Sequence, residues 1–260
     1  MKDSNSPVVL CFSGLDPTGG AGIQADIEAI GWHGCHTAPI ITANTIQNTH
    51  NVISFEAIDP TFILKQARVI LKDMPVRAIK IGMLCSGHTA EAIYTLLRQY
   101  KDIPVIFDPV LVAGGGSSLA HKNLIDAVNS LIIPHTHILT PNTPEALQLT
   151  SKKIAAETAA QHLNNMGADY VLLTGTHAET AHVIHKLYNR MKCEHIFPYP
   201  RLAHEYHGSG CTLAASIAAL IAHNIEPVNA CQNALDFTFK SLKTAQPLGS
   251  GQLIPNRRFS

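Results

Sequence analysis

Residues 8–30 read VVLCFSGLDPTGGAGIQADIEAI and contain three structural signals in succession. The run VVLCF (8–12) is short and apolar, as expected of a strand in a buried parallel sheet. The glycine-rich stretch GGAG (19–22) follows and predicts a tight turn. Ile23, Ile27 and Ile30 then fall at i, i+4 and i+7, which predicts an amphipathic helix that starts near Ala21. The stretch therefore predicts the strand, turn and helix of an α/β unit.

The same alternation of apolar runs and helical patterns continues along the chain. Further strands are predicted at residues 37–42, 78–81, 105–107, 137–139 and 170–173. Helices are predicted at residues 61–71, 89–100, 123–131 and 155–166, with Gly167 as the stop of the last one. Residues 182–188 and 193–197 resemble a hairpin. This pattern is typical of an α/β fold with a mostly parallel central sheet, helices on both faces and some antiparallel pairing.

Length and composition indicate a single globular domain. One hydrophobic core can support 260 residues. The richest Gly/Ser stretch, residues 113–118, has the length of an active-site flap and is short for a linker, so residues 1–260 are expected to form one domain. The 19 basic and 19 acidic side chains give no bulk charge that would favour nucleic acid as a partner. No stretch is long enough to span a bilayer, so no membrane partner is expected.

The cysteines and the N-terminal region predict a cytoplasmic location. The six cysteines are scattered singly, without a CxxC pair, which is typical of reduced thiols. The apolar run at 8–12 is too short for the apolar core of a signal peptide. The fifteen histidines include no pair at HExxH or a similar metal spacing.

Glycine and polar residues gather directly after the predicted strands. The segments are GLDPTGGAG (14–22), GML (82–84), DPV (108–110), TPNTPE (140–145) and TGTH (174–177). In open α/β sheets, ligands bind outside the carboxyl ends of the strands. We therefore expect a ligand site along this edge of the sheet.

The segment HGSGCT (207–212) runs directly into the small, apolar stretch LAASIAAL (213–220). A glycine-rich turn that leads into a helix builds an anion site, because the first N–H groups of the helix are unpaired and form its positive end. Cys211 lies inside that site, so its pKa is expected to be lowered. It is a candidate base, nucleophile or neutral member of the anion cradle. A Cys–His hydrolase, with His207 or His204 as base, is the alternative, although no orienting third group is evident.

Two candidate metal ligands also have structural interpretations. Asn142 and Glu145 suit a magnesium ion, which needs few protein ligands. However, Thr143 before Pro144, with Glu145 in the first turn, is also good helix-capping chemistry. Asp108 ends an apolar strand, where a carboxylate serves equally as a metal ligand or as a turn cap.

The glycine loop and Asp26 are ambiguous in the same way. The loop GGAG (19–22) lacks the GxGxxG order, which argues against a nicotinamide Rossmann site. The Walker pattern GxxxxGK[ST] is absent, which excludes ordinary P-loop kinases. Asp26 falls beside the isoleucine stripe of the first helix, where a solvated helix face is the default for a carboxylate.

Together these segments resemble the hydroxymethylpyrimidine and phosphomethylpyrimidine kinases of thiamin biosynthesis, within the ribokinase-like superfamily. The resemblance covers nearly the whole chain and rests on six motifs in order: GLDPTGGAGIQAD (14–26), QNT (47–49), KIGML (80–84), DPV (108–110), TPNTPE (140–145) and HGSGCT (207–212). It implies a ribokinase-like αβα sandwich, ATP and Mg²⁺ as cofactors, and a homodimer. The implied reaction is phosphoryl transfer to the hydroxymethyl group of 4-amino-5-hydroxymethyl-2-methylpyrimidine, followed by a second transfer onto the monophosphate.

The resemblance also implies roles for residues at the motif positions. Around the pyrimidine it places Gly14, Asp26, Thr45, Gln47, Met83 and Val110, with Asp26 and Gln47 hydrogen-bonded to the ring nitrogens and the amino group. The catalytic anion hole is Gly208, Ser209, Gly210 and Cys211, and the cysteine stands where sugar kinases of the superfamily carry an aspartate base. Asn142 and Glu145 match the magnesium-associated NxxE motif of the superfamily. We therefore expect Asn142, Thr174, Gly175 and Thr212 to contact the nucleotide, and Glu145, together with the strand-end carboxylate Asp108, to bind the magnesium ion. Phosphoryl transfer relies mainly on positioning and on charge neutralisation, which such groups supply.

The chain departs from the family pattern at three places. Thr174 stands where the family typically has a lysine that helps to hold the nucleotide phosphates. Thr45 replaces a residue that is usually apolar in the pyrimidine pocket. The flap at 113–118 lacks a lysine often found there. A pyridoxal kinase is therefore a close alternative, because that ring also carries a hydroxymethyl group. A pyrimidine-binding sensor without kinase activity is a third hypothesis.

Overall fold

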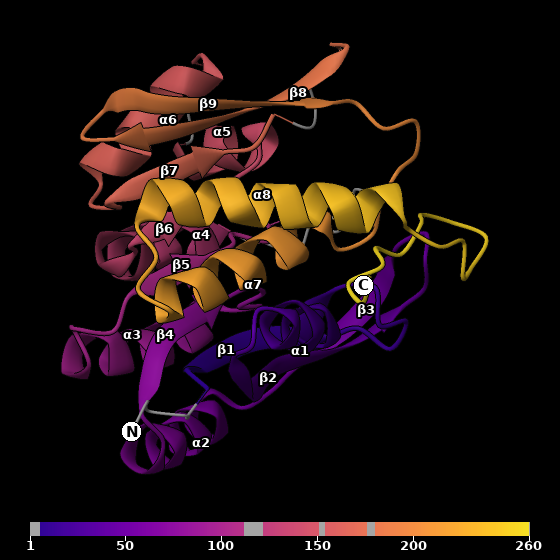
Figure 1. Ribbon diagram of the computed structural model, residues 1–260. Coiled ribbons are helices and arrows are strands. Elements are labelled where there is room, and N and C mark those ends of the chain that lie inside the picture. Colours follow the sequence, from indigo (N-terminus) through magenta and orange to yellow (C-terminus); the bar gives the residue numbers. More distant parts are fainter. Residues whose placement is uncertain (1–5, 112–121, 151–153, 176–179, 260) are drawn as a thin grey trace, which may run out of the picture.

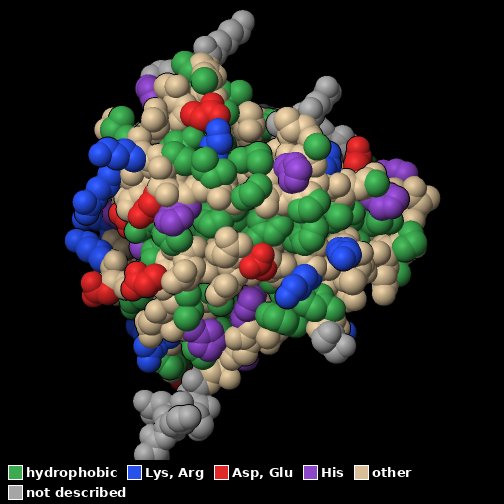
Figure 2. Space-filling view, turned by 45° about the horizontal axis from the view of Figure 1, so that its top comes forward, with side chains coloured by type: hydrophobic (Ala, Val, Ile, Leu, Met, Phe, Trp, Pro, Cys, Tyr) green, Lys and Arg blue, Asp and Glu red, His purple; other side chains and the backbone are tan. Residues whose placement is uncertain are grey.

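The computed structural model describes residues 6–111, 122–150, 154–175 and 180–259. The predicted flap at 113–118 lies outside the described residues, as do Thr176 and His177. In the described part of the chain, no helix is both long and apolar enough to cross a membrane. The face seen in Figure 2 mixes basic and acidic side chains, as expected for a chain with equal numbers of both.

One nine-stranded sheet runs through the molecule in the order β3-β2-β1-β4-β5-β6-β7-β8-β9. The strands are β1 (Val8–Leu15), β2 (His36–Gln47), β3 (Val52–Ala57), β4 (Val76–Ile81), β5 (Val105–Phe107), β6 (Ile138–Leu139), β7 (Tyr170–Leu173), β8 (His182–Asn189) and β9 (Lys192–Pro200). The strands from β2 to β7 pair in parallel, whereas β3, β8 and β9 pair antiparallel. The mostly parallel sheet and its late hairpin are thus confirmed.

Helices cover both faces of the sheet (Figure 1). They are α1 (Gly22–Trp32), α2 (Pro60–Asp73), α3 (Gly87–Gln99), α4 (Lys122–Ala127), α5 (Thr143–Thr150), α6 (Ala156–Asn165), α7 (Ser209–Ala222) and α8 (Pro227–Lys243). A π-helical turn, Val128–Ile132, continues α4. One core lies between the sheet and α2 to α6, and the other lies between the sheet and α1, α7 and α8.

The apolar run of β1 is continuous because both faces of this strand are buried. Val8, Leu10 and Phe12 belong to one core, whereas Val9 and Cys11 belong to the other. Successive side chains of a strand point to opposite faces, so a strand covered on both faces must be apolar at every position. The run at 8–12 therefore specifies a central strand of a three-layer sandwich.

Among the strands and α-helices of the described residues, β3 and α8 have no counterpart among the predicted elements. Strand β3 has no fully buried residue, so its sequence lacks the alternation that marks a half-buried strand. The buried face of α8 includes alanine, cysteine, threonine and serine, which weakens its apolar pattern.

A β-bulge changes the direction of the side chains in the last part of β2. The register with β1 shifts between Ser13 and Gly14, so that Thr42 is the extra residue. Before the bulge the even-numbered residues 38, 40 and 42 are buried, and after it the odd-numbered residues 43, 45 and 47 are the less exposed ones. A β-bulge re-aims the side chains that follow it.

Candidate active site

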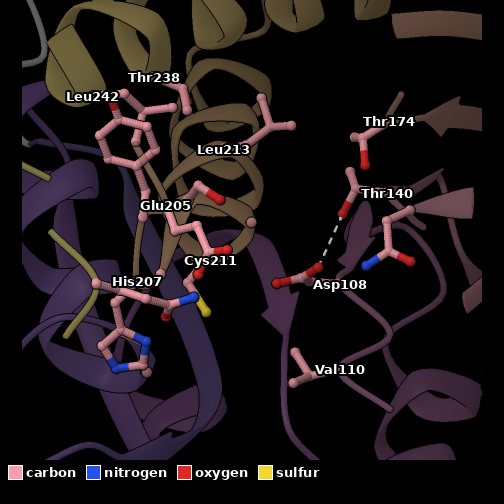
Figure 3. Close-up of a pocket in the computed structure, with 18 of the residues that line it drawn as sticks. Asp108, Val110, Thr140, Thr174, Glu205, His207, Cys211, Leu213, Thr238 and Leu242 are labelled. Carbon is pink, nitrogen blue, oxygen red and sulfur yellow. Dashed lines mark hydrogen bonds between the residues drawn. The ribbon is translucent and has the colours of Figure 1, made fainter. Parts of the chain in front are cut away.

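A cavity of about 620 Å³ opens at the carboxyl ends of the parallel strands. This volume suits a small organic ligand. Among the residues that line it are Gly14, Thr45, Gln47, Met83, Asp108, Val110, Asn142, Glu145, Thr174, Gly208, Ser209, Gly210 and Cys211. Cys211 and His207 approach from one side of the cavity, and Asp108 and Thr174 from the other (Figure 3). The structure thus brings thirteen of the sixteen predicted site residues to one cavity.

The anion loop is the start of α7. Gly208, the residue before the helix, has a φ of 78°, and a Cβ there would lie 2.0 Å from the carbonyl oxygen of Gly20. Only glycine fits both the left-handed backbone and this close approach. The backbone N–H groups of the first helical turn have no intrahelical acceptor, so they are available to an anion in the cavity.

His207 ties this loop to the loop that follows β1. Its Nε2 lies 2.8 Å from Oδ2 of Asp16, and both side chains are buried. Asp16 also accepts hydrogen bonds from the backbone N–H groups of Thr18 and Ala21, both at 2.8 Å. Burial raises the pKa of Asp16, but the hydrogen bonds from His207 and Thr18 hold it below its ordinary value. The hydrogen bond between His207 and Asp16 therefore holds the anion loop against the loop that follows β1.

Arg257, close to residue 260, also links the anion loop to the loop that follows β1. Its guanidinium is buried and donates to the Thr212 hydroxyl at 2.8 Å, to the Glu28 carboxylate at 3.2 Å and to the carbonyl oxygen of Gly20. Burial lowers the pKa of Arg257, while Glu28 raises it. The residue lies more than two hundred positions from the glycine loop, so no local motif could have shown this link.

The expected lowering of the Cys211 pKa is wrong. Burial, together with the carboxylates of Asp108 and Asp26, raises the pKa of this thiol to about 12, against the lowering effects of Lys80 and the Gly22 N–H. The sequence shows the helix start, which favours a thiolate, but not the carboxylates that the fold brings close. At neutral pH a thiol with this pKa carries its proton and no charge.

Asn142 and Glu145 form a helix cap at the start of α5. The backbone N–H of Asn142 donates to Oε2 of Glu145, and the backbone N–H of Glu145 donates to Oδ1 of Asn142, both at 2.9 Å. This reciprocal arrangement is a capping box with Asn142 as the N-cap. The capping interpretation is thus confirmed, with the cap one residue earlier than Thr143.

The capping box does not exclude a metal. Asp108 and Glu145 are both buried and line the same cavity. Burial raises the pKa of Asp108 to about 6, and burial together with Asp108 raises the pKa of Glu145 to about 8. Two carboxylates that repel each other in this way fit a Mg²⁺ ion, which takes oxygen ligands from one or two carboxylates. Among the described residues, no group of three or more His, Cys, Asp or Glu could hold a metal.

Asp26 does not line the cavity. It lies beneath the cavity floor, where Lys80 Nζ is 2.9 Å from its Oδ1 and 3.0 Å from its Oδ2. Ser13 donates to the same carboxylate. Burial would lower the pKa of Lys80, but the carboxylates of Asp26 and Asp108 help to raise it above its ordinary value. The solvated helix face expected for Asp26 is wrong, because its side chain is fully buried.

Lys80 was missed although a signal was present in the sequence. It stands inside the apolar strand β4, where a buried lysine requires a paired anion. It also lines the cavity, unlike its partner Asp26. An acidic residue on the apolar stripe of α1 and a lysine in a buried strand together suggest such a pair, but only the fold shows that the two meet.

Gly175 and Thr212 also do not line the cavity. A Cβ at Gly175 would lie 2.1 Å from the carbonyl oxygen of Ile184, so this glycine permits close packing against β8. The Thr212 hydroxyl donates to the carbonyl oxygen of Gly208 at 2.8 Å and accepts from Arg257. Gly175 therefore contacts β8 and Thr212 contacts the anion loop, both outside the cavity lining.

A family model described as phosphomethylpyrimidine kinase matches residues 16–256. The chain belongs to this family. As a member of the phosphomethylpyrimidine kinase family, it is 31% identical to the hydroxymethylpyrimidine/phosphomethylpyrimidine kinase of Aquifex aeolicus, over 95% of this chain and 98% of that protein. It is 32% identical to the Escherichia coli enzyme of the same name, over 94% of both chains.

A longer relative and two solved structures extend the comparison. The chain is 36% identical to the thiamine biosynthesis bifunctional protein ThiED of Geobacter sulfurreducens, over 94% of this chain, and spans 50% of that protein. A crystal structure of phosphomethylpyrimidine kinase from Clostridium difficile superposes with a TM-score of 0.78 at 28% identity, covering 90% of this chain and 98% of that one. An ADP complex of Bacillus subtilis pyridoxal kinase superposes with a TM-score of 0.88 at 25% identity, covering 97% and 98%. The ribokinase-like αβα sandwich is thus confirmed.

Proposed function

We propose that this member of the kinase family is an ATP-dependent kinase of thiamin biosynthesis. Its acceptors are 4-amino-5-hydroxymethyl-2-methylpyrimidine and the monophosphate of that alcohol. The observation that carries the proposal is that a single cavity contains both halves of the required site. Gln47, Met83 and Val110 line it together with the start of α7, Asp108 and Glu145.

The pyrimidine half of the cavity combines apolar and polar contacts. Met83 and Val110 offer apolar surface to a ring, and Gln47 offers an amide for its polar edge. A Cβ at Gly14 would lie 3.1 Å from the sulfur of Met83, so this glycine leaves room beside Met83. Asp26 acts through Lys80 and Ser13 in this proposal, because it does not reach the cavity surface.

The phosphate half supplies positive dipoles and a candidate metal site. The N–H groups of Ser209, Gly210 and Cys211 would hold phosphate oxygens, and the Asp108 and Glu145 carboxylates would hold Mg²⁺. When bound, Mg²⁺ neutralises charge on the transferred phosphoryl group. Cys211, a protonated thiol at neutral pH, would donate a hydrogen bond within this cradle. It would act as a base only as a thiolate, which requires its pKa to fall and its own proton to leave before the acceptor is deprotonated.

The test is a steady-state assay with purified protein, Mg-ATP and each acceptor. The expected result is ADP release that depends on the alcohol and, in a separate reaction, on its monophosphate. Absence of ADP release with both acceptors contradicts the proposal. A thermal shift with the pyrimidine but with neither shift nor turnover on Mg-ATP would favour the sensor instead.

Pyridoxal kinase is the second candidate, favoured by the superposition on the Bacillus subtilis pyridoxal kinase. A larger kcat/KM for pyridoxal than for the aminopyrimidine would promote it. We further propose that the protein is a cytoplasmic homodimer, which sedimentation of the purified protein and fractionation of cells would test.

A further inference from the structure

The orientation of Gln47 is set by a chain of hydrogen bonds that ends at Leu15. The Thr45 hydroxyl donates to the carbonyl oxygen of Leu15 at 2.7 Å. The side-chain Nε2 of Gln47 lies 2.7 Å from the same Thr45 hydroxyl oxygen. Thr45 and Gln47 are two apart on β2, on the same side of the strand, and both line the cavity.

The direction of these bonds follows from counting hydrogens. A threonine hydroxyl has one hydrogen, and a carbonyl oxygen has none to give. Since Thr45 donates to Leu15, it can only accept from Gln47. The Gln47 amide must therefore turn its NH₂ group toward Thr45.

The carbonyl oxygen of the amide is then left for a ligand. In a planar amide, the oxygen and the nitrogen are on different sides of the same carbon, so Oε1 faces away from Thr45. Within the described residues, the Gln47 side chain makes a single hydrogen bond, from Nε2 to Thr45, and none through Oε1. Gln47 therefore presents a fixed acceptor to the cavity.

We propose that Thr45 is a specificity-determining residue, which fixes the Gln47 amide so that the cavity selects a ring with an amino group beside its hydroxymethyl group. This inference rests on the proposed kinase function. The aminopyrimidine carries an amine, a hydrogen-bond donor, on the carbon next to the one that bears the hydroxymethyl group. Pyridoxal carries an aldehyde at the corresponding carbon, and its oxygen only accepts. Oε1 can bond to the amine, whereas against the aldehyde two acceptors meet without a hydrogen between them.

An apolar residue of the same shape would remove this constraint. In Thr45→Val the side chain keeps its branched form, but nothing holds the NH₂ group of Gln47. The amide can then rotate and donate to an aldehyde oxygen. Selectivity between the two rings should fall by about the value of one hydrogen bond, about five- to tenfold.

The experiment compares wild type, Thr45→Val and Thr45→Ser. For each protein, kcat/KM is measured with the aminopyrimidine and with pyridoxal at saturating Mg-ATP, after thermal unfolding has verified the fold. The ratio of the two kcat/KM values should shrink about five- to tenfold in Thr45→Val, mainly because the value for pyridoxal rises. Thr45→Ser keeps the hydroxyl and should keep the wild-type ratio.

Two results would overturn the inference: a ratio in Thr45→Val within twofold of wild type, or a Thr45→Ser ratio as low as that of Thr45→Val. If wild type phosphorylates neither ring, the kinase function fails on its own. The inference is then decided by the calorimetric Kd of each ring for the same three proteins. A Kd ratio that is unchanged in Thr45→Val overturns it in the same way.

Discussion

Lys80 Nζ lies 2.9 Å from Oδ1 of Asp26, and neither side chain is exposed to solvent. The pair connects β4 to α1 directly beneath the cavity. Removing one member of a buried ion pair leaves the other charge without compensation, which is costly in a medium of low dielectric constant.

Lys80→Met is therefore expected to lower the free energy of unfolding by about 3–5 kcal/mol. The double variant Lys80→Met with Asp26→Asn should recover much of this loss, because no charge is left unpaired. Urea unfolding measures both. The control is Lys186→Met, which breaks the exposed pair with Glu157 at 2.8 Å and should cost about 0–1 kcal/mol. Equal losses in Lys80→Met and Lys186→Met would contradict this prediction.

Arg257 and Arg258 offer a matched pair for testing the loop contacts. Both pair with Glu28, but Arg257 is buried against Gly20 and Thr212, whereas the Arg258 side chain is 75% exposed. Arg257→Gln should raise the KM for Mg-ATP about tenfold and lower stability by about 2–3 kcal/mol, because charged hydrogen bonds to both loops are lost. Arg258→Gln should change stability by less than about 0.5 kcal/mol. Kinetics at a temperature where both variants are folded separate positioning from stability, and an unchanged KM in Arg257→Gln would exclude a positioning role.

The raised pKa of Cys211 predicts slow alkylation. Iodoacetamide reacts with thiolates, and a thiol with a pKa of about 12 is almost entirely protonated at pH 8. The exposed Cys193 should be modified first, and modification of Cys211 should still be rising above pH 10. Peptide mass spectrometry over time measures both sites in one sample. Faster labelling of Cys211 than of Cys193 at pH 7 would contradict the raised pKa and support the lowered pKa expected from the helix start.

Activity tests the role of the same thiol. We expect Cys211→Ala to remove most of the kinase turnover, because the thiol belongs to the phosphate cradle. Cys211→Ser keeps a hydrogen-bond donor and should retain more activity than Cys211→Ala. Unchanged turnover in Cys211→Ala would count against any direct role.

The raised pKa of Glu145 predicts that the free energy of unfolding falls as the pH rises. Its folded pKa of about 8 lies above its ordinary value of 4.5, so between these values the folded state binds more protons than the unfolded state. The free energy of unfolding then decreases as the pH rises from about 5 to 8. Glu145→Gln keeps an acceptor for the Asn142 N–H but removes the charge. In EDTA at pH 8 its Tm should exceed that of wild type by at least about 2–4 °C, and the difference should vanish near pH 5. A Tm at pH 8 below that of wild type would contradict this.

Substitutions at Thr174 test whether the cavity accepts the lysine that the family typically has at this position. Its side chain lines the cavity, and its backbone N–H donates to the carbonyl oxygen of Pro141 at 2.9 Å, a contact that a substitution of the side chain leaves in place. Thr174→Lys should keep or raise kcat/KM for Mg-ATP, since a cation across the cavity from the anion loop would attract the phosphates. Thr174→Val is the control for the loss of the hydroxyl. A lower kcat/KM in Thr174→Lys than in Thr174→Val would show that this cavity has no place for the cation.

The fold was largely predictable because burial on both faces of the sheet leaves a direct mark on the chain. Each central strand must be apolar at consecutive positions, and each covering helix repeats its apolar residues every three to four positions. The edge strand β3 has no fully buried residue and left no such mark. The strand-end motifs were predictive for a different reason, because parallel strands bring their carboxyl ends to one edge of the sheet.

The sequence by itself therefore determined the layers of the sandwich, the edge that carries the cavity and the anion loop around Cys211. The tertiary structure alone decided the charge state of that loop, the pairing of Lys80 with Asp26 and the contact of Arg257 with Gly20. A strand or helix is specified by neighbours in the chain, whereas a pKa or an ion pair depends on distances between groups far apart in the sequence. The N-terminus of α7 favours a thiolate at Cys211, but burial and the nearby carboxylates outweigh it.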